Sequence, residues 1–222
     1  MMIVFYTIVG LGLGFVGFQL AQFSLLTSSP KSKLKNDLSF LRGLLSNAIS
    51  DDYPKDFEIN DLKELSPNIL MSDRKLGVNP IRSGTFASIF QEPIVYFASK
   101  QFNTKPGAFL YITRIGDLEF DFFKYDSEIL VYEKEKSLGV INSNGEFTDN
   151  NGSIIAKRIP SKDKSLYSVY VNDRKIASMI KPEEVSKAEI SRLFTILDIE
   201  NDKELVPTLV LVSHYLRTMF LD

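Results

Sequence analysis

The chain has no cysteine and only one histidine among its 222 residues. These absences exclude thiol nucleophiles, thiolate zinc sites and metal sites built on a pair of histidines. The chain also lacks the Gly-x-Ser-x-Gly turn of serine hydrolases and the phosphate-binding loop Gly-x-x-x-x-Gly-Lys-Ser/Thr. The sequence therefore predicts no catalytic residue, no metal site and no cofactor, and we expect a protein that is not an enzyme.

Charged side chains are absent from residues 1–30. A helix of about 25 residues is roughly 38 Å long, which is enough to cross the roughly 30 Å hydrocarbon core of a bilayer. We therefore predict a transmembrane helix over residues 1–26, in which Gly10 and Gly14 form a small-residue face for close helix packing. A cleaved signal peptide is the alternative, but no basic residue precedes Lys31 and the apolar run is long.

The same segment has a third interpretation, because it contains the spacing Gly12-x-Gly14-x-x-Gly17 after an apolar run. This spacing is typical of the turn that holds a pyrophosphate in dinucleotide-binding folds. Such a fold needs a second buried strand that ends in an acidic residue about 20 residues later. Residues 28–37 are instead polar and contain a proline. The pattern therefore favours the membrane helix.

Basic residues follow the apolar segment but do not precede it. Lys31, Lys33 and Lys35 lie in a polar stretch, residues 27–36, which we interpret as a flexible juxtamembrane linker. The positive-inside rule predicts a single-pass membrane protein whose C-terminal domain is cytoplasmic. Each lysine near the membrane can contribute about 1 kcal/mol of attraction to anionic headgroups. We therefore expect these three lysines to contact lipid headgroups.

The remainder has the composition of a globular domain. The net charge of the whole chain is −2 and the two signs are interspersed, which argues against nucleic acid as a partner. Residues 37–79 are predicted to form a helical or irregular lead-in. It contains a helix from Asp37 to Ile49 and a possible helical turn over residues 60–65.

From residue 80 onwards, short runs rich in β-branched and aromatic residues alternate with turn dipeptides such as Asn144-Gly145 and Asn151-Gly152. The predicted strands are residues 85–90, 94–99, 108–115, 118–125, 128–133, 137–142, 153–159, 166–172, 175–180 and 192–199. A helix over residues 183–190 interrupts them. This spacing predicts an antiparallel barrel or sandwich over residues 80–222.

The segment from Glu204 to Leu221 is apolar on most faces of a helix. Its uncharged part, Leu205–Leu216, is only about 18 Å long as a helix, which is too short to cross a bilayer. A helix that is apolar on all sides is normally buried, and the inside of a closed barrel can surround one. We therefore expect a mainly β fold, an antiparallel barrel around a hydrophobic C-terminal helix. Pro207 is expected in its first turn, and His214 is expected to be buried and hydrogen-bonded to a neighbour.

Two acidic patterns have simple structural interpretations. Glu119 and Asp121 share one face of a predicted strand, and we expect both to be outward and solvated. They would suggest catalysis only in a cleft of the glycosidase kind. The run Asp149-Asn150-Asn151-Gly152 lacks the spaced ligands of a calcium loop, so it predicts a turn.

Three segments resemble the tubby C-terminal-like superfamily, which includes tubby, phospholipid scramblases and LURP-one-related proteins. They are residues 167–177, residues 194–199 and the apolar helix that follows. The resemblance implies a 12-stranded barrel with a hydrophobic helix running through it. The membrane segment of scramblases follows the barrel, whereas here it precedes the barrel. No site residue of the family is carried over, because neither a calcium-binding segment nor a phosphoinositide-binding pocket matches this chain.

Two functions from different classes follow from these observations. The first is a non-enzymatic, membrane-anchored β-barrel protein that binds lipid at the cytoplasmic face of a membrane. The alternative is a membrane-anchored module for protein interaction or assembly, whose partner is a membrane protein or a second copy of the chain. An enzyme that binds a dinucleotide through the N-terminal glycines is a distant third.

Overall fold

The computed structural model describes residues 31–49, 57–76, 79–103, 106–162, 165–181, 184 and 192–220. The chain divides into two compact units, residues 1–40 and residues 41–222. The predicted transmembrane segment 1–26, with all its glycines, lies outside the described residues, as does all but one residue of the predicted helix 183–190. Across the described ranges, none of the helices is both long and apolar enough to span a bilayer.

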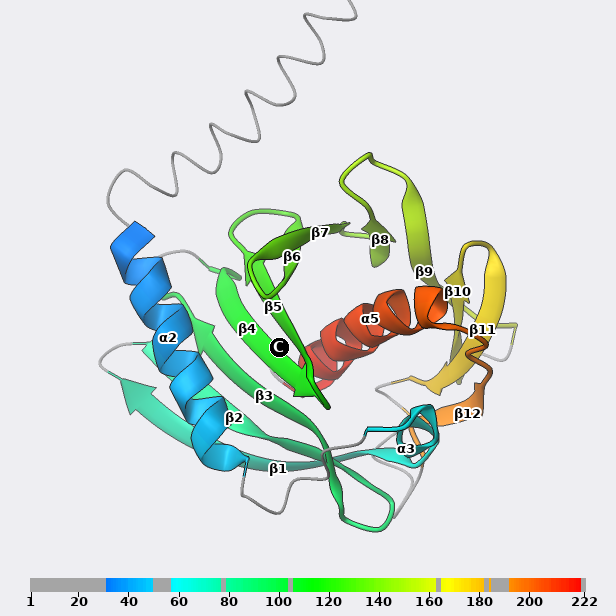
Figure 1. Cartoon of the computed structure of the whole chain (residues 1–222), viewed down its shortest axis with the longest axis horizontal. Helices are drawn as coiled ribbons and strands as arrows, with labels where there is room; N and C mark the ends of the chain where they lie inside the picture. The colour runs from blue at the N-terminus through cyan, green and yellow to red at the C-terminus, as the bar shows by residue number, and fades with distance from the viewer. Residues whose placement is uncertain are drawn as a thin grey trace, which may run out of the picture. The chain divides into compact units, whose positions relative to one another are not determined.

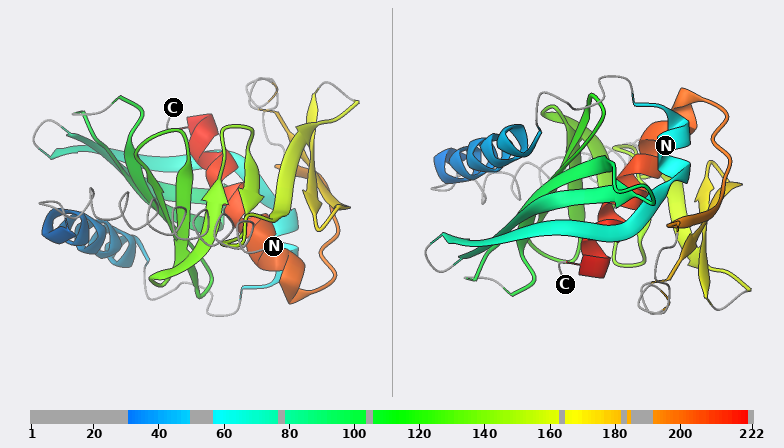
Figure 2. Two further views of the ribbon diagram at one scale, coloured as in Figure 1. Left: turned by 90° about the horizontal axis from the view of Figure 1, so that it is seen from above. Right: turned by 90° about the horizontal axis from the view of Figure 1, so that it is seen from below.

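Within the described part of the chain, twelve strands form one antiparallel sheet in which each strand pairs with the next. The sheet curls around the C-terminal helix α5 (Asp202–Phe220), as Figures 1 and 2 show. The strands are β1 (Leu65–Leu76), β2 (Asn79–Ser88), β3 (Pro93–Gln101), β4 (Phe109–Ile115), β5 (Leu118–Lys124), β6 (Ile129–Glu133), β7 (Lys136–Ile141), β8 (Glu146–Thr148), β9 (Ile154–Pro160), β10 (Leu166–Val171), β11 (Arg174–Ile180) and β12 (Phe194–Leu197). The other helices are α2 (Lys31–Ala48) and α3 (Ile59–Lys63).

The barrel is nearly closed where its last strand meets its first. No strand pairing joins β12 to β1 among the described residues. Instead, the backbone N–H of Leu193 donates to the carbonyl oxygen of Leu65 over 2.6 Å. Beside it, Arg192 forms an ion pair with Glu64 at 2.8 Å. Backbone and side-chain contacts therefore join the two edges at this point.

Helix α5 forms the centre of the hydrophobic core. Residues 207–217 are all buried, so the helix is covered on every side. Its apolar side chains belong to one cluster with the inward side chains of the strands. A series of neighbouring rings on β2 to β5 lies in the same cluster, with centroids 5.0 to 6.1 Å apart: Phe86, Phe97, Tyr111 and Phe122. The prediction of a barrel around a hydrophobic helix is confirmed.

Two side-chain hydrogen bonds join α5 to the wall of the barrel, one with β4 and one with β11. The Thr113 hydroxyl donates to the Ser213 hydroxyl over 3.1 Å. The Tyr215 hydroxyl donates to the carbonyl oxygen of Ile180. These bonds satisfy buried donors that would otherwise be costly, and they link the helix to the wall of the barrel.

The structure corrects several predicted boundaries. Helix α2 begins at Lys31, so residues 31–36 of the predicted linker are helical. Helix α5 begins at Asp202, so Pro207 lies in the second turn and not in the first. Strand β1 lies in the predicted lead-in and was not predicted as a strand. Its sequence contains a proline, Pro67, and many polar residues, so it lacks the usual strand pattern. Strand β8 was also missed, because three residues are too few to show an alternating pattern.

Enclosure of α5 gives a prediction for stability. Leu216 is fully buried inside the barrel, so Leu216→Ala should lower the free energy of unfolding by about 2–5 kcal/mol. Ile196 on β12 is 56% exposed, and Ile196→Ala should change the free energy of unfolding by no more than about 0.5 kcal/mol. Urea denaturation of the two variants and the parent chain measures the difference. Equal losses would show that the helix does not fill the core.

Candidate functional site

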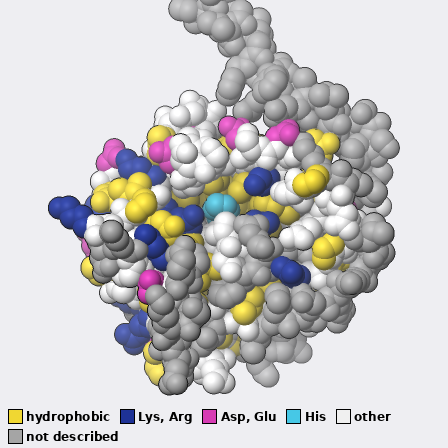
Figure 3. Space-filling view, turned by 180° about the vertical axis from the view of Figure 1, so that it is seen from behind, with side chains coloured by type: hydrophobic (Ala, Val, Ile, Leu, Met, Phe, Trp, Pro, Cys, Tyr) yellow, Lys and Arg dark blue, Asp and Glu magenta, His cyan; other side chains and the backbone are white. Residues whose placement is uncertain are grey.

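A polar pocket opens at the end of the barrel where α5 finishes. It has a volume of about 240 Å³. Drug-sized ligands occupy pockets of about 300–1,000 Å³, so this pocket suits a smaller polar group. Figure 3 shows the single histidine of the chain among Lys, Arg and hydrophobic side chains. The lining residues are Lys124, Ser127, Ile129, Asn142, Ser143, Asn144, Gly145, Arg158, His214, Arg217 and Thr218.

Separate elements supply the cations of this pocket. Lys124 is the last residue of β5, and Arg158 lies on β9 two positions after the buried Ala156, on the same face of the strand. Arg217 follows His214 by three residues, so both lie on the same face of α5. Lys124, Arg158 and Arg217 are therefore far apart in the sequence, and the fold brings them together at the end of the barrel where α5 finishes.

Arg158 is held by aromatic rings and not by a carboxylate. Its guanidinium carbon lies 4.9 Å from the ring centroid of Tyr167 and 4.7 Å from that of Tyr215. Burial lowers the pKa of Arg158, and the two tyrosines oppose this effect. Its Nη1 atom is buried and has no hydrogen-bond partner. Such a donor carries a desolvation cost that an acceptor from a ligand would remove.

Three cationic side chains belong to the described lining of the pocket. No carboxylate belongs to its lining, and among the described residues none forms an ion pair with Lys124 or Arg158. The C-terminal end of α5 contributes roughly half a negative charge. This is small beside the charges of Lys124 and Arg158. The balance therefore favours an anion in this pocket.

His214 is buried as predicted, with 8% of its surface exposed, but its Nδ1 atom has no hydrogen-bond partner. The predicted hydrogen bond to a neighbour is therefore wrong for this atom. Burial, followed by the charges of Arg158, Arg217 and Lys124, lowers the pKa of His214 to about 3. The imidazole is neutral at physiological pH, so it offers one donor nitrogen and one acceptor nitrogen.

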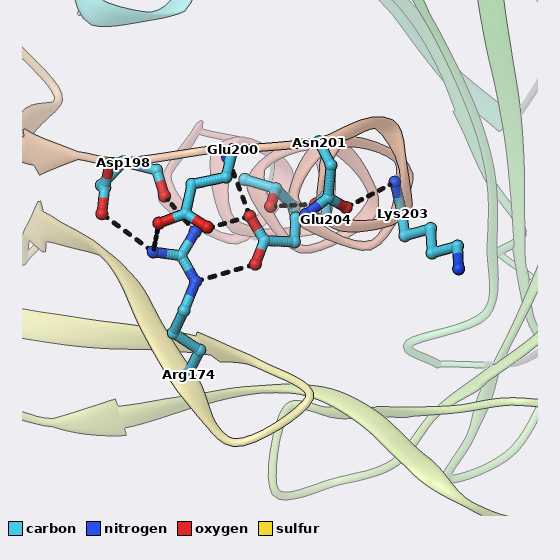
Figure 4. A network of polar contacts seen from close by, with 7 residues as sticks. Arg174, Asp198, Glu200, Asn201, Lys203 and Glu204 are labelled. Atoms are coloured by element: carbon cyan, nitrogen blue, oxygen red, sulfur yellow. Dashed lines mark hydrogen bonds and ion pairs between the residues drawn. The ribbon is translucent and has the colours of Figure 1, made fainter.

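Several arginines elsewhere in the described residues have carboxylate partners. At the opposite end of α5, Arg174 contacts Glu204 at 2.6 Å, Asp198 at 2.9 Å and Glu200 at 3.0 Å, as Figure 4 shows. The hydrogen bond with Glu204, which is the largest effect, raises the pKa of Arg174. This network fixes the start of α5 to β11. The contrast makes Lys124 and Arg158, which have no carboxylate partner among the described residues, a distinctive feature of the pocket.

Glu119 and Asp121 are buried, with 8% and 6% of their surfaces exposed, so the prediction of solvated positions is wrong. Arg42 covers them: its Nε donates to Glu119 over 2.8 Å and its Nη2 to Asp121 over 2.7 Å. Arg114 also donates to Glu119 over 2.6 Å. The four side chains form an ion-pair cluster in which Arg42 contacts both carboxylates, so a structural role accounts for this pair.

The two carboxylates of this cluster differ in acidity. Burial raises the pKa of Asp121 to about 6 against the opposing charge of Arg42. Burial would also raise the pKa of Glu119, but hydrogen bonds from Arg114 and Arg42 lower it overall. Asp121 therefore takes up a proton before Glu119 does.

The other predicted site residues lie outside the pocket-lining set. Lys31, Lys33 and Lys35 fall in the first turns of α2, in the first compact unit, and Lys35 is exposed. Helical spacing places position 33 on the opposite side of the helix from positions 31 and 35. Asp149 accepts the backbone N–H groups of Asn151 and Ser153, each over 2.9 Å, so the predicted turn is confirmed. The described residues contain no cluster of three or more His, Asp or Glu side chains able to hold a metal.

Sequence reasoning missed Lys124, Arg158 and Arg217 as site residues. Two signals could have pointed to them. Arg217 interrupts a helix that is expected to be buried, and Arg158 occupies an inward position two residues from Ala156. A charged residue at a core-facing position requires a partner or an opening to solvent.

Comparisons with known proteins add no further assignment. No protein-family model, no curated protein and no solved structure matches this chain. The functional argument therefore depends on the geometry and charge of the pocket.

The buried imidazole gives a prediction about acid stability. The pKa of His214 in the folded chain, about 3, is below its ordinary value of 6.5. Between these values the unfolded chain binds a proton that the folded chain does not, so stability falls as the pH falls. From pH 7.5 to pH 4.5, the parent should lose about 2–3 kcal/mol of unfolding free energy relative to His214→Gln. Urea denaturation at both pH values measures this, and equal losses in the two proteins would contradict it.

The ion-pair cluster gives a prediction with the opposite pH dependence. Arg42→Met leaves the Asp121 carboxylate buried without its cation, which should cost about 2–3 kcal/mol of unfolding free energy at pH 7.5. The pKa of Asp121 is about 6 with Arg42 present and higher without it, so this cost should shrink as the pH falls towards 6 and should largely disappear at pH 5, where the carboxyl is protonated in both proteins. Thermal and urea denaturation at pH 7.5 and 5 test this. The control is Lys175→Met at an exposed position, and a loss that is independent of pH would be evidence against the assignment.

Proposed function

We propose that this protein is a non-enzymatic, membrane-anchored β-barrel protein that binds the phosphate of an anionic lipid headgroup. The binding site is the pocket lined by Lys124, Arg158, His214 and Arg217. The observation that carries this proposal is the buried Nη1 atom of the Arg158 guanidinium, which has no hydrogen-bond acceptor.

The energetics of this guanidinium support an anionic ligand. A buried charge is costly unless it is paired and hydrogen-bonded. Arg158 gains only cation–π contacts from the protein, and these are weaker than a charge-assisted hydrogen bond to a phosphate oxygen. Lys124 and Arg217 border the same cavity and add to the attraction. A phosphate group with a small substituent suits the volume of about 240 Å³.

The membrane part of the proposal comes from the sequence. Residues 1–26 are uncharged and long enough for one transmembrane helix, and Lys31, Lys33 and Lys35 follow them. We propose that Gly10 and Gly14 allow this helix to pack closely against another, and that the lysines contact headgroups on the cytoplasmic side. Such an anchor would keep the pocket at a high effective concentration near the lipid.

The proposed family relation follows from architecture. A 12-stranded barrel around a hydrophobic helix is what the resemblance to the tubby C-terminal-like superfamily implies. We propose membership of that superfamily on this ground and on the segments that carry the resemblance. The proposed lipid function does not depend on it, because it is argued from the pocket.

A module for protein assembly is the second candidate. Ile196 is exposed on β12, and among the described strands β12 pairs only with β11. An open strand edge can accept an extended segment of another chain. The pocket is the more specific feature, because such an edge explains none of its charges.

The lipid proposal predicts the effect of one substitution. The full-length chain in non-ionic detergent should bind dioctanoyl phosphatidic acid, and Arg158→Gln should weaken binding about 10- to 100-fold, as expected for a lost charge-assisted hydrogen bond. Thermophoresis measures the dissociation constants. Lys136→Gln, an exposed position at the start of β7, is the control with the same change in charge.

Binding of equal strength by Arg158→Gln and Lys136→Gln would reject the pocket as the lipid site. A partner protein retained by both variants, with no binding of lipid by either, would favour the assembly module.

A further inference from the structure

We infer that the phosphate bound in this pocket carries a glycerol substituent, and that His214 and Thr218 accept hydrogen bonds from the hydroxyl groups of that glycerol. The inference rests on the proposed function and deepens it, since it names the group attached to the phosphate. The chemical class is a phosphoglycerol, carried by a lipid or free in solution.

His214 supplies the first acceptor. The residue is 8% exposed, and its buried Nδ1 atom has no hydrogen-bond partner among the described residues. Burial, followed by the charges of Arg158, Arg217 and Lys124, lowers the pKa of His214 to about 3, so the imidazole is neutral at physiological pH. A neutral imidazole has one nitrogen with a proton and one with a lone pair. Positive charge around the pocket stabilises the tautomer whose lone pair faces it, which makes Nδ1 the acceptor nitrogen.

Thr218 supplies a second acceptor. Its hydroxyl donates to the carbonyl oxygen of Tyr215 over 2.8 Å, so the proton of this hydroxyl is already used. The oxygen keeps its lone pairs and can accept a hydrogen bond from a ligand. Residues four positions apart lie on the same face of a helix, and both His214 and Thr218 line the pocket. A ligand that fits this pair therefore carries hydrogen-bond donors as well as a phosphate.

The charges of the pocket favour a hydroxyl over an ammonium as this donor. An ammonium group, as in an ethanolamine headgroup, would place a positive charge beside Lys124 and Arg158. The described lining contains no carboxylate to offset that charge. Glu146 of β8 lies outside this lining and accepts a hydrogen bond from Asn142 over 2.8 Å. A hydroxyl donates a hydrogen bond without adding charge, so a polyol suits the site.

The size of the pocket limits the polyol. Its volume of about 240 Å³ is below the range of about 300–1,000 Å³ for drug-sized ligands. Part of this volume is needed for the phosphate, which Lys124 and the unpartnered Nη1 atom of Arg158 attract. A glycerol attached to the phosphate is short, and its two free hydroxyls provide one donor for each acceptor.

The turn between β7 and β8 gives the pocket a preformed wall. The Oδ1 atom of Asn142 accepts the backbone N–H groups of Asn144 over 2.9 Å and Glu146 over 3.0 Å. Gly145 adopts a φ of 77°, in the left-handed region that favours glycine, and its N–H donates to the carbonyl oxygen of Asn142 over 3.0 Å. A wall fixed in this way lowers the entropy cost of binding a small substituent.

Two lipids of equal charge test the inference. The full-length chain in non-ionic detergent is titrated with dioctanoyl phosphatidylglycerol and with dioctanoyl phosphatidylethanol. Both are singly charged phosphodiesters, and only the first has hydroxyls on its headgroup. We expect phosphatidylglycerol to bind about tenfold more tightly, as expected for two additional hydrogen bonds. Thermophoresis measures the dissociation constants, and equal affinity for the two lipids would overturn the inference.

Variants assign the preference to the two acceptors. His214→Phe and Thr218→Val should each weaken the binding of phosphatidylglycerol and leave that of phosphatidylethanol unchanged. Thr218 is only partly buried and valine has nearly the same shape, so this variant tests the inference even if His214→Phe does not fold. Lys136→Gln, at an exposed position, should keep the preference. An equal loss of affinity for both lipids in Thr218→Val would contradict the role given to its hydroxyl.

The single histidine of the chain allows a direct observation of the acceptor nitrogen. The full-length protein, labelled with ¹⁵N-histidine and purified without a histidine tag, gives one imidazole in its spectrum. We expect Nδ1 to carry no proton, and its resonance to move to lower frequency when phosphatidylglycerol binds but not when phosphatidylethanol binds. An Nδ1 atom that carries a proton in the phosphatidylglycerol complex would overturn the assignment.

A competition experiment separates the two sources of phosphoglycerol. If glycerol 1-phosphate displaces phosphatidylglycerol at concentrations near the dissociation constant of the lipid, the ligand is the soluble compound. If much higher concentrations are needed, the ligand is the lipid.

The two proposals fail in different ways. If the parent binds phosphatidylglycerol and phosphatidylethanol equally and Arg158→Gln weakens both, the inference about glycerol is wrong and the proposed function stands. If Arg158→Gln has no effect on the binding of either lipid, the proposed function fails, and the inference fails with it.

Discussion

An apolar helix that must be covered on all sides is the constraint from which the rest of this structure follows. Helix α5 has no polar stripe to present to water along residues 207–217. A single flat sheet could cover only one side of it, whereas a curled sheet of twelve strands covers them all. The inward aromatic side chains, the hydrogen bond between Thr113 and Ser213, and the contacts that join the edges of β1 and β12 all serve this enclosure.

The same enclosure makes it costly in free energy to bury a charged side chain, and the two ends of α5 meet this cost in different ways. Arg174 of β11, beside the start of α5, and Arg42 of α2, against β5, each have carboxylate partners. At the other end of the helix, Arg158 has aromatic rings in place of a carboxylate and His214 remains neutral. A functional interpretation is stronger for this end because Arg42 and Arg174 show that this barrel can supply carboxylate partners to its arginines.

Local pattern was a good guide to the strands and a poor guide to the charges. The ten predicted strands all correspond to observed ones, because alternation and turn dipeptides are encoded within a few residues. Strand β1 escaped detection because an edge strand tolerates Pro67 and polar side chains. The burial of Glu119 could not be foreseen, since its partner Arg42 is 77 positions away in the chain. The pocket could not be predicted from the sequence for the same reason, because its cations come from three elements that only the folded barrel brings together. His214 was recognised as buried, but its neighbours, which determine its acidity, were not.

The order of the elements has a consequence for biosynthesis. The helix that fills the barrel follows all twelve strands along the chain. While the ribosome is still adding strands, the sheet has nothing to wrap around, and its inward phenylalanines remain open to water or to chaperones. The barrel can therefore close only after α5 has emerged, and the proposed N-terminal membrane anchor would hold the unfinished sheet at the bilayer during that interval.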